Sequence, residues 1–521
     1  MKRLAIVGSG PMALYSLKHI RDMSERRKIT VFEATNIVGT GMPYRVGMNA
    51  DTMLSNAFSR EIPSVTHTFI DWLKNQPSSE LSKWGLSQHE LSARAFYPRL
   101  LVGAYLQAEF EAVCEQLRQA GHEVRVLSCH KVIDVIPLMH NFMLQCEINE
   151  EVKIFESDDL FIATGHVWPE APEIDGVSLV SPWPYTNVTS LPPTSLGVVG
   201  SSLSAIDSIV ALGHAHGNFK AQGAGLCWQP NAEAKSLMIR MVSKEGVMPE
   251  GDFYYPLPYT PLTYLTEEAV AAEIAKGTEG LLERVFTLLL KEFDATAPDY
   301  LPSLGENARS LAGFGKAYFK RRQALGGLEA VKRDFVKTCT SIREKVTIAH
   351  RYTLLRGHEI FGQVLRDLTN DDYTAFQKHL MPVFADCYAV VPHVSLAKVL
   401  ALYDAGVLTL QQMKSASAFR EIPSGGISID TGTEKYRVPY LIDTRGQKSA
   451  SLSDLPFKGL VSVLKDPEAL LLEPFRLDTD SAQKVYCLAM PQLLERYPFS
   501  QGLAYCHDLS QIAVSDYVNK T

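Results

Sequence analysis

Three things are scarce in this chain of 521 residues: paired cysteines, long apolar runs and an excess of positive charge. The eight cysteines show no CxxC spacing, which argues against a zinc ribbon or a dithiol redox pair. Scattered free thiols are typical of a reducing compartment, so we predict a cytoplasmic protein. No uncharged apolar run approaches the roughly 18–20 residues of a membrane span, and the one near Met1 is too short for a signal peptide. The net charge of −7 offers no footprint for nucleic acid.

Motifs for hydrolysis and for metal binding are also missing. The sequence contains no HExxH motif, no metal-spaced histidine cluster and no order of serine, histidine and aspartate typical of a triad. We therefore predict no metal site and expect a small-molecule substrate whose chemistry a bound organic cofactor carries.

Residues 3–33 contain a strand–turn–helix–strand unit. Residues 3–7 form an apolar run that ends at glycine, and residues 29–33 form a second such run. Between them, Ala13, Leu14, Leu17 and Ile20 fall on one face of a predicted helix. This pattern predicts a βαβ unit with a parallel pair of strands.

The turn of this unit is a GxGxxA fingerprint for a dinucleotide. Gly8 allows a tight turn, Gly10 leaves room for a pyrophosphate against the backbone, and Ala13 lets helix and strand pack closely. Pro11 and Met12 open the helix, whose first N–H groups face the phosphates. Glu33 ends the second strand, where a carboxylate binds the adenosine ribose hydroxyls. The alternatives are an ordinary glycine turn and a solvated acid at a strand end.

A second unit of this kind begins near residue 196. Residues 196–199 form its first strand, Gly213 is placed to end its helix, and residues 238–242 form its next strand. Its turn has serine in place of the middle glycine, so the alternative to an NAD(P) site is a structural βαβ unit. The predicted NAD(P)-binding residues of the turn are Gly200, Ser201, Ser202, Leu203 and Ser204. Ser243 and Lys244 after the second strand suit a 2′-phosphate, so we predict NADPH, with NADH possible. The alternative is that these two residues form a solvated turn.

These units predict an α/β protein with two Rossmann-like dinucleotide-binding domains and a large helical insertion. The first is a glutathione-reductase-like FAD domain and the second an NAD(P) domain. Prolines cluster between residues 169 and 193, where we place the connection. The predicted boundaries are 1–190 for the first part of the FAD domain, 195–255 for the NAD(P) domain, 256–415 for the helical insertion and 416–521 for the return to the FAD domain.

The helical insertion is the predicted substrate domain. Its candidate substrate residues are Arg351, Arg356 and His358, because guanidinium groups clamp carboxylates through two hydrogen bonds. The alternatives are that both arginines anchor the insertion and that His358, which shares a helical face with apolar residues, is a hydrogen-bonded core histidine. Residues 320–322 (KRR) are interpreted as a solvated face, and residues 373–384 as one helical stripe.

Seven segments together resemble one bacterial family, the YdhS-like FAD-NAD(P)-binding proteins. They are GTGMPY (39–44), MLSNAFSREIP (53–63), FYPRLLVGAYL (96–106), ATGHVWP (163–169), GSSLSAID (200–207), IDTRGQ (442–447) and PFSQGLAYCHD (498–508). The resemblance runs from end to end and implies FAD in the first domain and NAD(P) in the second. The residues that it places on FAD are Gly8, Gly10, Ala13, Glu33, Gly39, Gly41, Tyr44, Asn56, Arg99, Val132, Thr164, Gly165, Gly502 and Leu503. For Thr164 and Gly165 the alternative is a sharp turn before the proline-rich connection.

The function that this resemblance implies is an FAD-dependent, NAD(P)H-using oxidoreductase. Distant relatives of the family include flavin monooxygenases that oxygenate amino groups, so we expect a monooxygenase for a small amine or amino acid. Two alternatives stay open: an NAD(P)H-dependent reductase or dehydrogenase without oxygenation, and a flavin-binding protein without turnover.

Overall fold

The chain folds into two compact units. The computed structural model describes residues 1–169, 172–223, 225–388, 390–414, 418–479 and 483–519. The first unit comprises Met1–Trp168 and Gln447–Thr521, and the second comprises Pro169–Gly446. The crossing after Trp168 falls in the proline-rich stretch, as the sequence indicates. The divisions between the two units, after Trp168 and after Gly446, differ from the predicted boundaries at residues 190 and 416.

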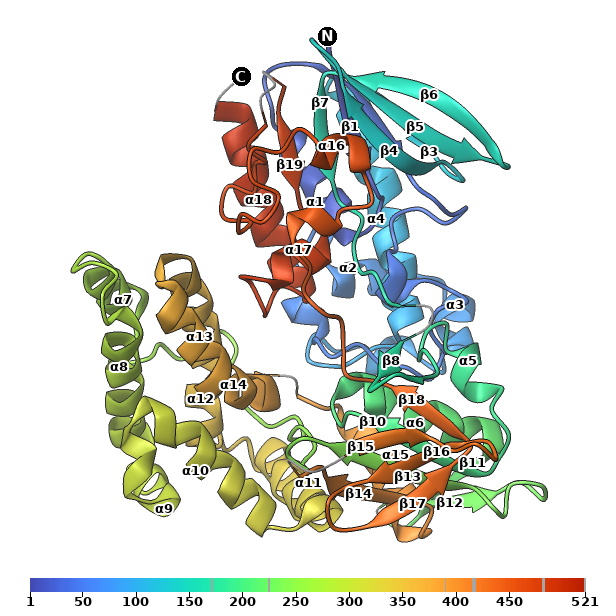
Figure 1. The fold of residues 1–521 in the computed structure, drawn as a ribbon, viewed down its shortest axis with the longest axis vertical. Helices are drawn as coiled ribbons and strands as arrows, with labels where there is room; N and C mark the ends of the chain where they lie inside the picture. The colour runs from blue at the N-terminus through green and yellow to red at the C-terminus, as the bar shows by residue number, and fades with distance from the viewer. Residues whose placement is uncertain (170–171, 224, 389, 415–417, 480–482, 520–521) are drawn as a thin grey trace. The chain divides into compact units, whose positions relative to one another are not determined.

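A five-stranded parallel sheet forms the centre of the first unit (Figure 1). Its strands, in spatial order, are β19 (Val485–Cys487), β7 (Asp159–Ile162), β1 (Lys2–Val7), β2 (Arg27–Phe32) and β3 (Glu123–Leu127). In chain order the strands lie as 3-2-1-4-5, the order of a three-stranded Rossmann half with two further strands. The predicted strands at residues 3–7 and 29–33 are β1 and β2, and Glu33 follows β2 directly.

Helices pack against this sheet through apolar faces. In α1 (Pro11–Ile20), the predicted stripe of Ala13, Leu14, Leu17 and Ile20 is fully buried. The other regular elements of the unit are α2 (Phe69–Lys74), α3 (Ser78–Lys83), α4 (Arg99–Gln119), α16 (Lys458–Val461), α17 (Met490–Leu494), α18 (Leu503–Asn519) and an antiparallel sheet of β4 (Lys131–Pro137), β5 (Phe142–Ile148) and β6 (Glu151–Ser157). Both α1 and α18 begin at the carboxyl end of the sheet (Figure 1).

A four-stranded parallel sheet forms the centre of the second unit. Its strands, in spatial order, are β14 (Leu408–Gln412), β13 (Met238–Ser243), β10 (Ser195–Val199) and β18 (Tyr440–Asp443). In chain order this is again 3-2-1-4. The run at residues 440–444, which we assigned to the first domain, therefore completes the second sheet, beside β10.

The connection after β10 differs from the sequence-based expectation. The helix α6 (Leu203–His216) runs past Gly213, whose missing Cβ leaves room for the ring of Phe219, so this glycine serves packing and does not end the helix. A hairpin of β11 (Gly217–Gln222) and β12 (Gly225–Pro230) then leads back to β13.

The helical region lies in the chain between β13 and β14. Its helices are α7 (Glu267–Ile274), α8 (Leu281–Thr296), α9 (Tyr300–Leu304), α10 (Leu311–Ala324), α11 (Gly327–Glu344), α12 (Ala349–Val364), α13 (Asn370–His379), α14 (Met381–Tyr388) and α15 (His393–Asp404). As predicted, Thr266 caps α7 by accepting the N–H of Ala269. The stripe at residues 373–384 is divided between α13 and α14, so the prediction of one helix there is wrong.

Two of these helices belong to the core of the second sheet. Leu328 and Val331 of α11 and Leu396 of α15 share a buried apolar cluster with Leu196 of β10 and Ile239 of β13. The predicted insertion is therefore not a separate body from end to end. The remaining elements of the unit are β8 (Glu173–Ile174), β9 (Val177–Ser178), α5 (Thr186–Thr189) and a sheet of β15 (Ala418–Glu421), β16 (Ile427–Asp430) and β17 (Lys435–Val438). Among the described residues, no helix combines the length and the apolar character that crossing a membrane requires.

Candidate functional site

The first glycine turn has a backbone that only glycine can adopt. Gly8 has φ +102°, and a Cβ on it would lie 2.2 Å from the carbonyl oxygen of Ala163 at the end of β7. Gly10 lies against a second glycine turn, since a Cβ on it would lie 3.2 Å from the Cα of Gly41. The two turns therefore meet backbone to backbone at the carboxyl end of β1, where dinucleotides bind in this fold.

The first turn of α1 leaves backbone donors at this place. No side chain caps the helix at Gly10, and Pro11 has no N–H group. The N–H groups of Met12 and Ala13 lie in the first turn, where an α-helix provides no partner for them. Together with the helix dipole, these groups form a site for a phosphate.

Glu33 is held in a fixed orientation by the surrounding loops. Its Oε2 accepts a hydrogen bond from the Ser9 hydroxyl at 2.7 Å, and its Oε1 accepts from the N–H and the hydroxyl of Thr35 at 2.9 and 2.8 Å. The Ser9 oxygen also accepts the N–H of Gly39 at 3.2 Å, which links the carboxylate to the second turn. A carboxylate has about four acceptor positions, so Glu33 keeps capacity for a ribose hydroxyl.

The second turn contains a buried polar atom that matches a bound ligand. The hydroxyl of Thr40, between Gly39 and Gly41, is buried and has no hydrogen-bond partner among the described residues. Buried hydroxyls without partners are rare, so a ligand oxygen that bonds Thr40 would satisfy it. Tyr44 ends the turn, and its carbonyl abuts α4, where a Cβ on Gly103 would lie 2.2 Å away.

Two further predicted segments join the first site. Thr164 and Gly165 follow β7 directly beside Gly8, and a Cβ on Gly165 would meet open space. Gly502 and Leu503 begin α18, and a Cβ on Gly502 would also meet open space. The structure thus gathers the glycine turns and the helix start at the carboxyl end of the first sheet.

Three predicted residues have looser connections to this site. Arg99 begins α4 and donates its Nε to the carbonyl of Leu54 at 3.1 Å. Val132 lies on β4, two residues after His130, whose N–H bonds the carbonyl of Glu33. Asn56 is exposed, and no contact places it at the site. The arrangement of the other residues fits FAD, with the diphosphate at the two turns and the adenosine ribose at Glu33.

The second unit repeats the construction of the first. Gly200 has φ +116°, and a Cβ on it would lie 2.7 Å from the hydroxyl of Thr444, just after β18. Gly8 stands in the same relation to Ala163 after β7, the fourth strand of its own sheet. Ser202 is exposed at the start of α6, and its side chain does not cap the helix. The first N–H groups of α6 and the hydroxyl of Ser202 are therefore available to bind a phosphate.

The other predicted NAD(P) residues differ in whether they are free to bind a phosphate. The Ser201 hydroxyl donates to the carbonyl of Val247 at 2.6 Å, so it holds the loop after β13 and is not free to donate to a phosphate. Leu203 and Ser204 open α6. Ser243 ends β13 and accepts the N–H of Gly246, while Lys244 is exposed beside it. A serine and a cation at the end of the second strand fit a 2′-phosphate.

The predicted substrate residues turn out to be structural. His358 is buried, its Nδ1 contacts the carbonyl of Leu355, and its ring stacks on Tyr388 at 4.9 Å between centroids. Burial lowers the pKa of His358 to about 4, so it is neutral at pH 7. Arg356 lies over the ring of Tyr259 at 4.0 Å and pairs with Glu359 on its own helix. The structure thus supports the alternatives that His358 is a hydrogen-bonded core histidine and that Arg356 anchors the insertion.

Arg351 belongs to a buried ionic network. Its side chain is 2% exposed, its Nε lies 2.7 Å from Glu250, and its Nη1 lies 3.3 Å from Asp334. Arg322 reaches the same Glu250 at 2.5 Å and Asp386 at 3.4 Å. Burial raises the pKa of Glu250, but Arg351 and Arg322 outweigh that effect and lower it to about 2. Arg351 therefore anchors α12 to the segment after β13.

The interpretation of residues 320–322 as a solvated face is wrong for Arg322. Lys320 and Arg321 are exposed, whereas the side chain of Arg322 is 13% exposed and paired with two carboxylates. The sequence carried a signal: Phe314, Tyr318 and Arg322 are spaced by four residues and so share one face of α10, which is buried. A cationic residue in line with a buried stripe predicts a buried partner of opposite charge.

The chain is similar to known proteins in both units. Residues 5–167 match the family described as FAD-NAD(P)-binding, and residues 266–388 match the YdhS-like middle domain. Over 517 residues the chain is 32% identical to the protein YdhS of Escherichia coli (strain K12), covering 98% of this chain and 96% of that protein.

Solved structures share the fold at low identity. The reduced form of ornithine hydroxylase from Pseudomonas aeruginosa matches with a TM-score of 0.53 and 11% identity, covering 100% of this chain and 99% of that chain. Ornithine N-hydroxylase from Kutzneria sp. 744 matches with a TM-score of 0.49 and 13% identity, covering 100% of this chain and 99% of that chain. The predicted fold class, with its parallel sheets and helical middle region, is confirmed. The family description also confirms FAD and a nicotinamide dinucleotide as its cofactors.

Proposed function

The chain belongs to the YdhS-like family of FAD-NAD(P)-binding proteins, and from this membership we propose that it is an FAD-dependent, NAD(P)H-using monooxygenase for a small amine or amino acid. The observation that carries the proposal is the repeated construction of the glycine turn. Gly8 lies against the end of β7 and Gly200 against the end of β18, each at the carboxyl edge of a sheet whose first four strands in the chain are ordered 3-2-1-4. An enzyme that passes electrons between two dinucleotides needs two such sites.

FAD, when bound, supplies the electron transfer and the oxygen chemistry, so this chain's own residues serve binding and orientation. The N–H groups of Met12 and Ala13 bind the diphosphate, and Thr40 donates its hydroxyl to it. Glu33, fixed by Ser9, binds the adenosine ribose hydroxyls. The N-terminal end of α18 at Gly502 places a positive dipole at the flavin, worth on the order of 1 kcal/mol for an anionic reduced state.

The nicotinamide dinucleotide is assigned to the second turn. The N–H groups at the start of α6 and the exposed Ser202 hydroxyl bind its diphosphate. Ser243 and Lys244 bind the 2′-phosphate, which favours NADPH over NADH.

The substrate class rests on analogy with the shared fold. Ornithine hydroxylase from Pseudomonas aeruginosa, whose structure matches over the full chain, gives an amine of an amino acid as the example. The second candidate is an NAD(P)H-dependent reductase. Among such reductases, one that works without a redox-active cysteine pair is favoured, because the eight cysteines have no CxxC spacing.

Product analysis separates the two candidates. Purified protein with bound FAD is mixed with NADPH, air and a panel of small amines and amino acids, and three rates are measured: NADPH loss, oxygen uptake and hydroxylated product by mass spectrometry. A monooxygenase gives hydroxylated product in proportion to oxygen uptake with at least one amine. NADPH oxidation with release of hydrogen peroxide alone, whatever the amine, identifies the reductase. Bound FAD that NADPH does not reduce identifies the non-catalytic alternative.

A further inference from the structure

A cavity of about 250 Å³ lies within the helical region of the second unit. Its walls come from the segment after β13 and from α9, α10, α11 and α12. The volume exceeds the ~150 Å³ that accommodates benzene in an engineered protein cavity, so a small organic molecule fits. The family descriptions assign no ligand to this region, which is called a middle domain.

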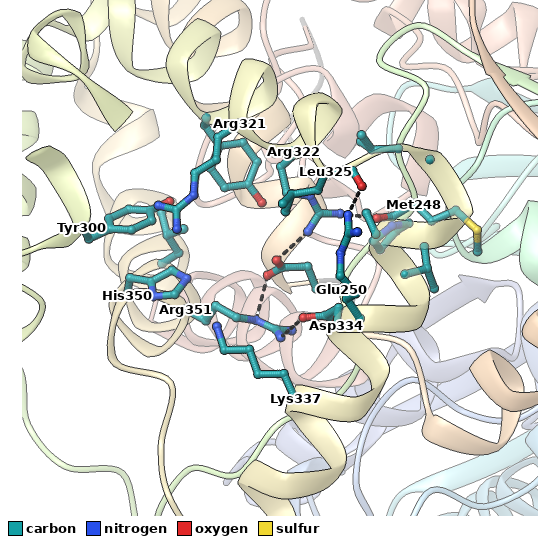
Figure 2. Close-up of a pocket in the computed structure, with 18 residues that line it drawn as sticks. Met248, Glu250, Tyr300, Arg321, Arg322, Leu325, Asp334, Lys337, His350 and Arg351 are labelled. Carbon is teal, nitrogen blue, oxygen red and sulfur yellow. Dashed lines mark hydrogen bonds and ion pairs between the residues drawn. The ribbon is translucent and has the colours of Figure 1, made fainter. Parts of the chain in front are cut away.

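One wall of the cavity is the buried ionic network (Figure 2). Glu250 is shared by Arg322 and Arg351, and Asp334 also pairs with Arg351. Asp386, which does not line the cavity, pairs with Arg322 and accepts a hydrogen bond from the hydroxyl of Tyr318, and burial raises the pKa of Asp386 to about 6. Each carboxylate of this wall thus already has a cationic partner.

The rim of the cavity has three more cations. Arg321, Arg333 and Lys337 are all exposed residues that line it. Arg321 bonds the hydroxyl of Ser303 and Arg333 bonds the carbonyl of Leu325, both neutral acceptors. In the part of the chain that the structure describes, no ion pair involves any of the three rim cations. Figure 2 shows Arg321 and Lys337 on opposite sides of the open space.

An aromatic wall completes the cavity. The rings of Tyr300 and His350 stack at 4.3 Å between centroids, and the guanidinium of Arg321 lies 5.7 Å above the Tyr300 ring. Burial lowers the pKa of His350 to about 4, so this ring adds no charge at pH 7 and leaves the rim as the source of positive potential. Leu325 and Val331 provide apolar surface for the carbon skeleton of a ligand.

We propose that this cavity binds a small organic anion with two or more negative charges, whose carboxylate or phosphate groups lie among Arg321, Arg333 and Lys337. Three like charges around one cavity repel one another, and a multivalent anion removes that repulsion while it gains charge-assisted hydrogen bonds. The five lining cations, Arg321, Arg322, Arg333, Lys337 and Arg351, outnumber the two lining acids, Glu250 and Asp334. The site goes beyond the proposed flavin chemistry, since anion binding requires no electron transfer.

Calorimetry on the full chain, purified with FAD in a buffer without phosphate, tests the proposal. Citrate is the polycarboxylate probe and glycerol 2-phosphate is the phosphate-ester probe, so the two titrations tell which group the cavity takes. The double variant Arg321→Met/Lys337→Met removes two rim cations. We expect it to weaken binding of the preferred probe about tenfold or more, because hydrogen bonds to charged groups are lost.

The matched control is Lys320→Met/Arg343→Met, which removes two exposed cations from the same helices, α10 and α11, outside the cavity lining. It should bind the probe as the wild-type chain does. Arg333→Met is a second, independent variant that should also weaken binding, and it carries the test if the double variant does not fold. Absence of binding by both probes to the wild-type chain, or equal weakening in the control, overturns the proposal.

Discussion

The buried ionic network around Arg351 leads us to predict that this residue stabilises the second unit. Its guanidinium is 2% exposed and is the shared partner of Glu250 and Asp334, and it also bonds the carbonyl of Gly251. Arg351→Met keeps much of the side-chain volume but leaves Asp334 without its cation and Glu250 with Arg322 alone. Removing one partner of a buried ion pair costs about 3–5 kcal/mol, because the remaining charge stays buried. We therefore expect Arg351→Met to lower the free energy of unfolding of the second unit by about 3–5 kcal/mol.

The assay is thermal unfolding by calorimetry, in which units that unfold separately give separate transitions. A loss of about 3–5 kcal/mol lowers the melting temperature of a domain of this size by roughly 10 °C. Arg356→Met is the matched control, because its partly exposed ion pair with Glu359 and its contact with Tyr259 contribute only about 1 kcal/mol. The reasoning is refuted if the two variants melt alike. Loss of substrate-stimulated NADPH consumption in an Arg351→Met protein of normal stability would restore the substrate-clamp interpretation.

Three further predictions concern cofactors and pH. Gly10→Val places a branched side chain at the proposed diphosphate site, so the purified variant should lack FAD by absorbance, whereas Gly225→Val in the hairpin should retain it. Lys244→Glu should raise the KM for NADPH far more than that for NADH, and equal changes would rule out the 2′-phosphate assignment. The pKa of His358 is about 4 in the folded state against about 6.5 when unfolded, so its contribution to stability is present above pH 6.5 and lost toward pH 4. Denaturation from pH 7 to 4 should show that His358→Phe removes about 3 kcal/mol of this acid dependence.

Local patterns in the sequence predicted the local parts of the fold well. The strand, glycine turn and helix at residues 3–20 follow from a buried run, Gly8 and a helical stripe, all within one short segment. The cap of α7 by Thr266 is likewise a property of four consecutive residues. These features depend on backbone conformation and periodicity, which neighbouring residues determine.

The errors concern contacts between distant segments. Residues 440–444 read correctly as a strand, but a parallel strand finds its neighbour through a long crossover, and nothing near it in sequence indicates which sheet it joins. The burial of Arg322 depends on Glu250, more than seventy residues away. Charged residues are mostly exposed, so three consecutive cationic residues favoured the interpretation of residues 320–322 as a solvated face. Only the spacing of four residues from Tyr318 indicated that Arg322 is buried.

The orphaned hydroxyl of Thr40 shows a similar limit for the candidate site. The family resemblance implies Gly39 and Gly41 as cofactor residues, while the threonine between them is an ordinary polar residue in sequence. Only its burial without a partner among the described residues marks it as a ligand contact.

The most direct test of the account is anaerobic mixing of the purified, FAD-containing chain with NADPH while the visible absorbance of the oxidised cofactor is followed. If the turns at Gly8 and Gly200 hold a flavin and a nicotinamide dinucleotide that exchange electrons, the absorbance disappears with one equivalent of NADPH. Absorbance that persists in excess NADPH and excess NADH would contradict the claim that this chain is an NAD(P)H-dependent flavin enzyme.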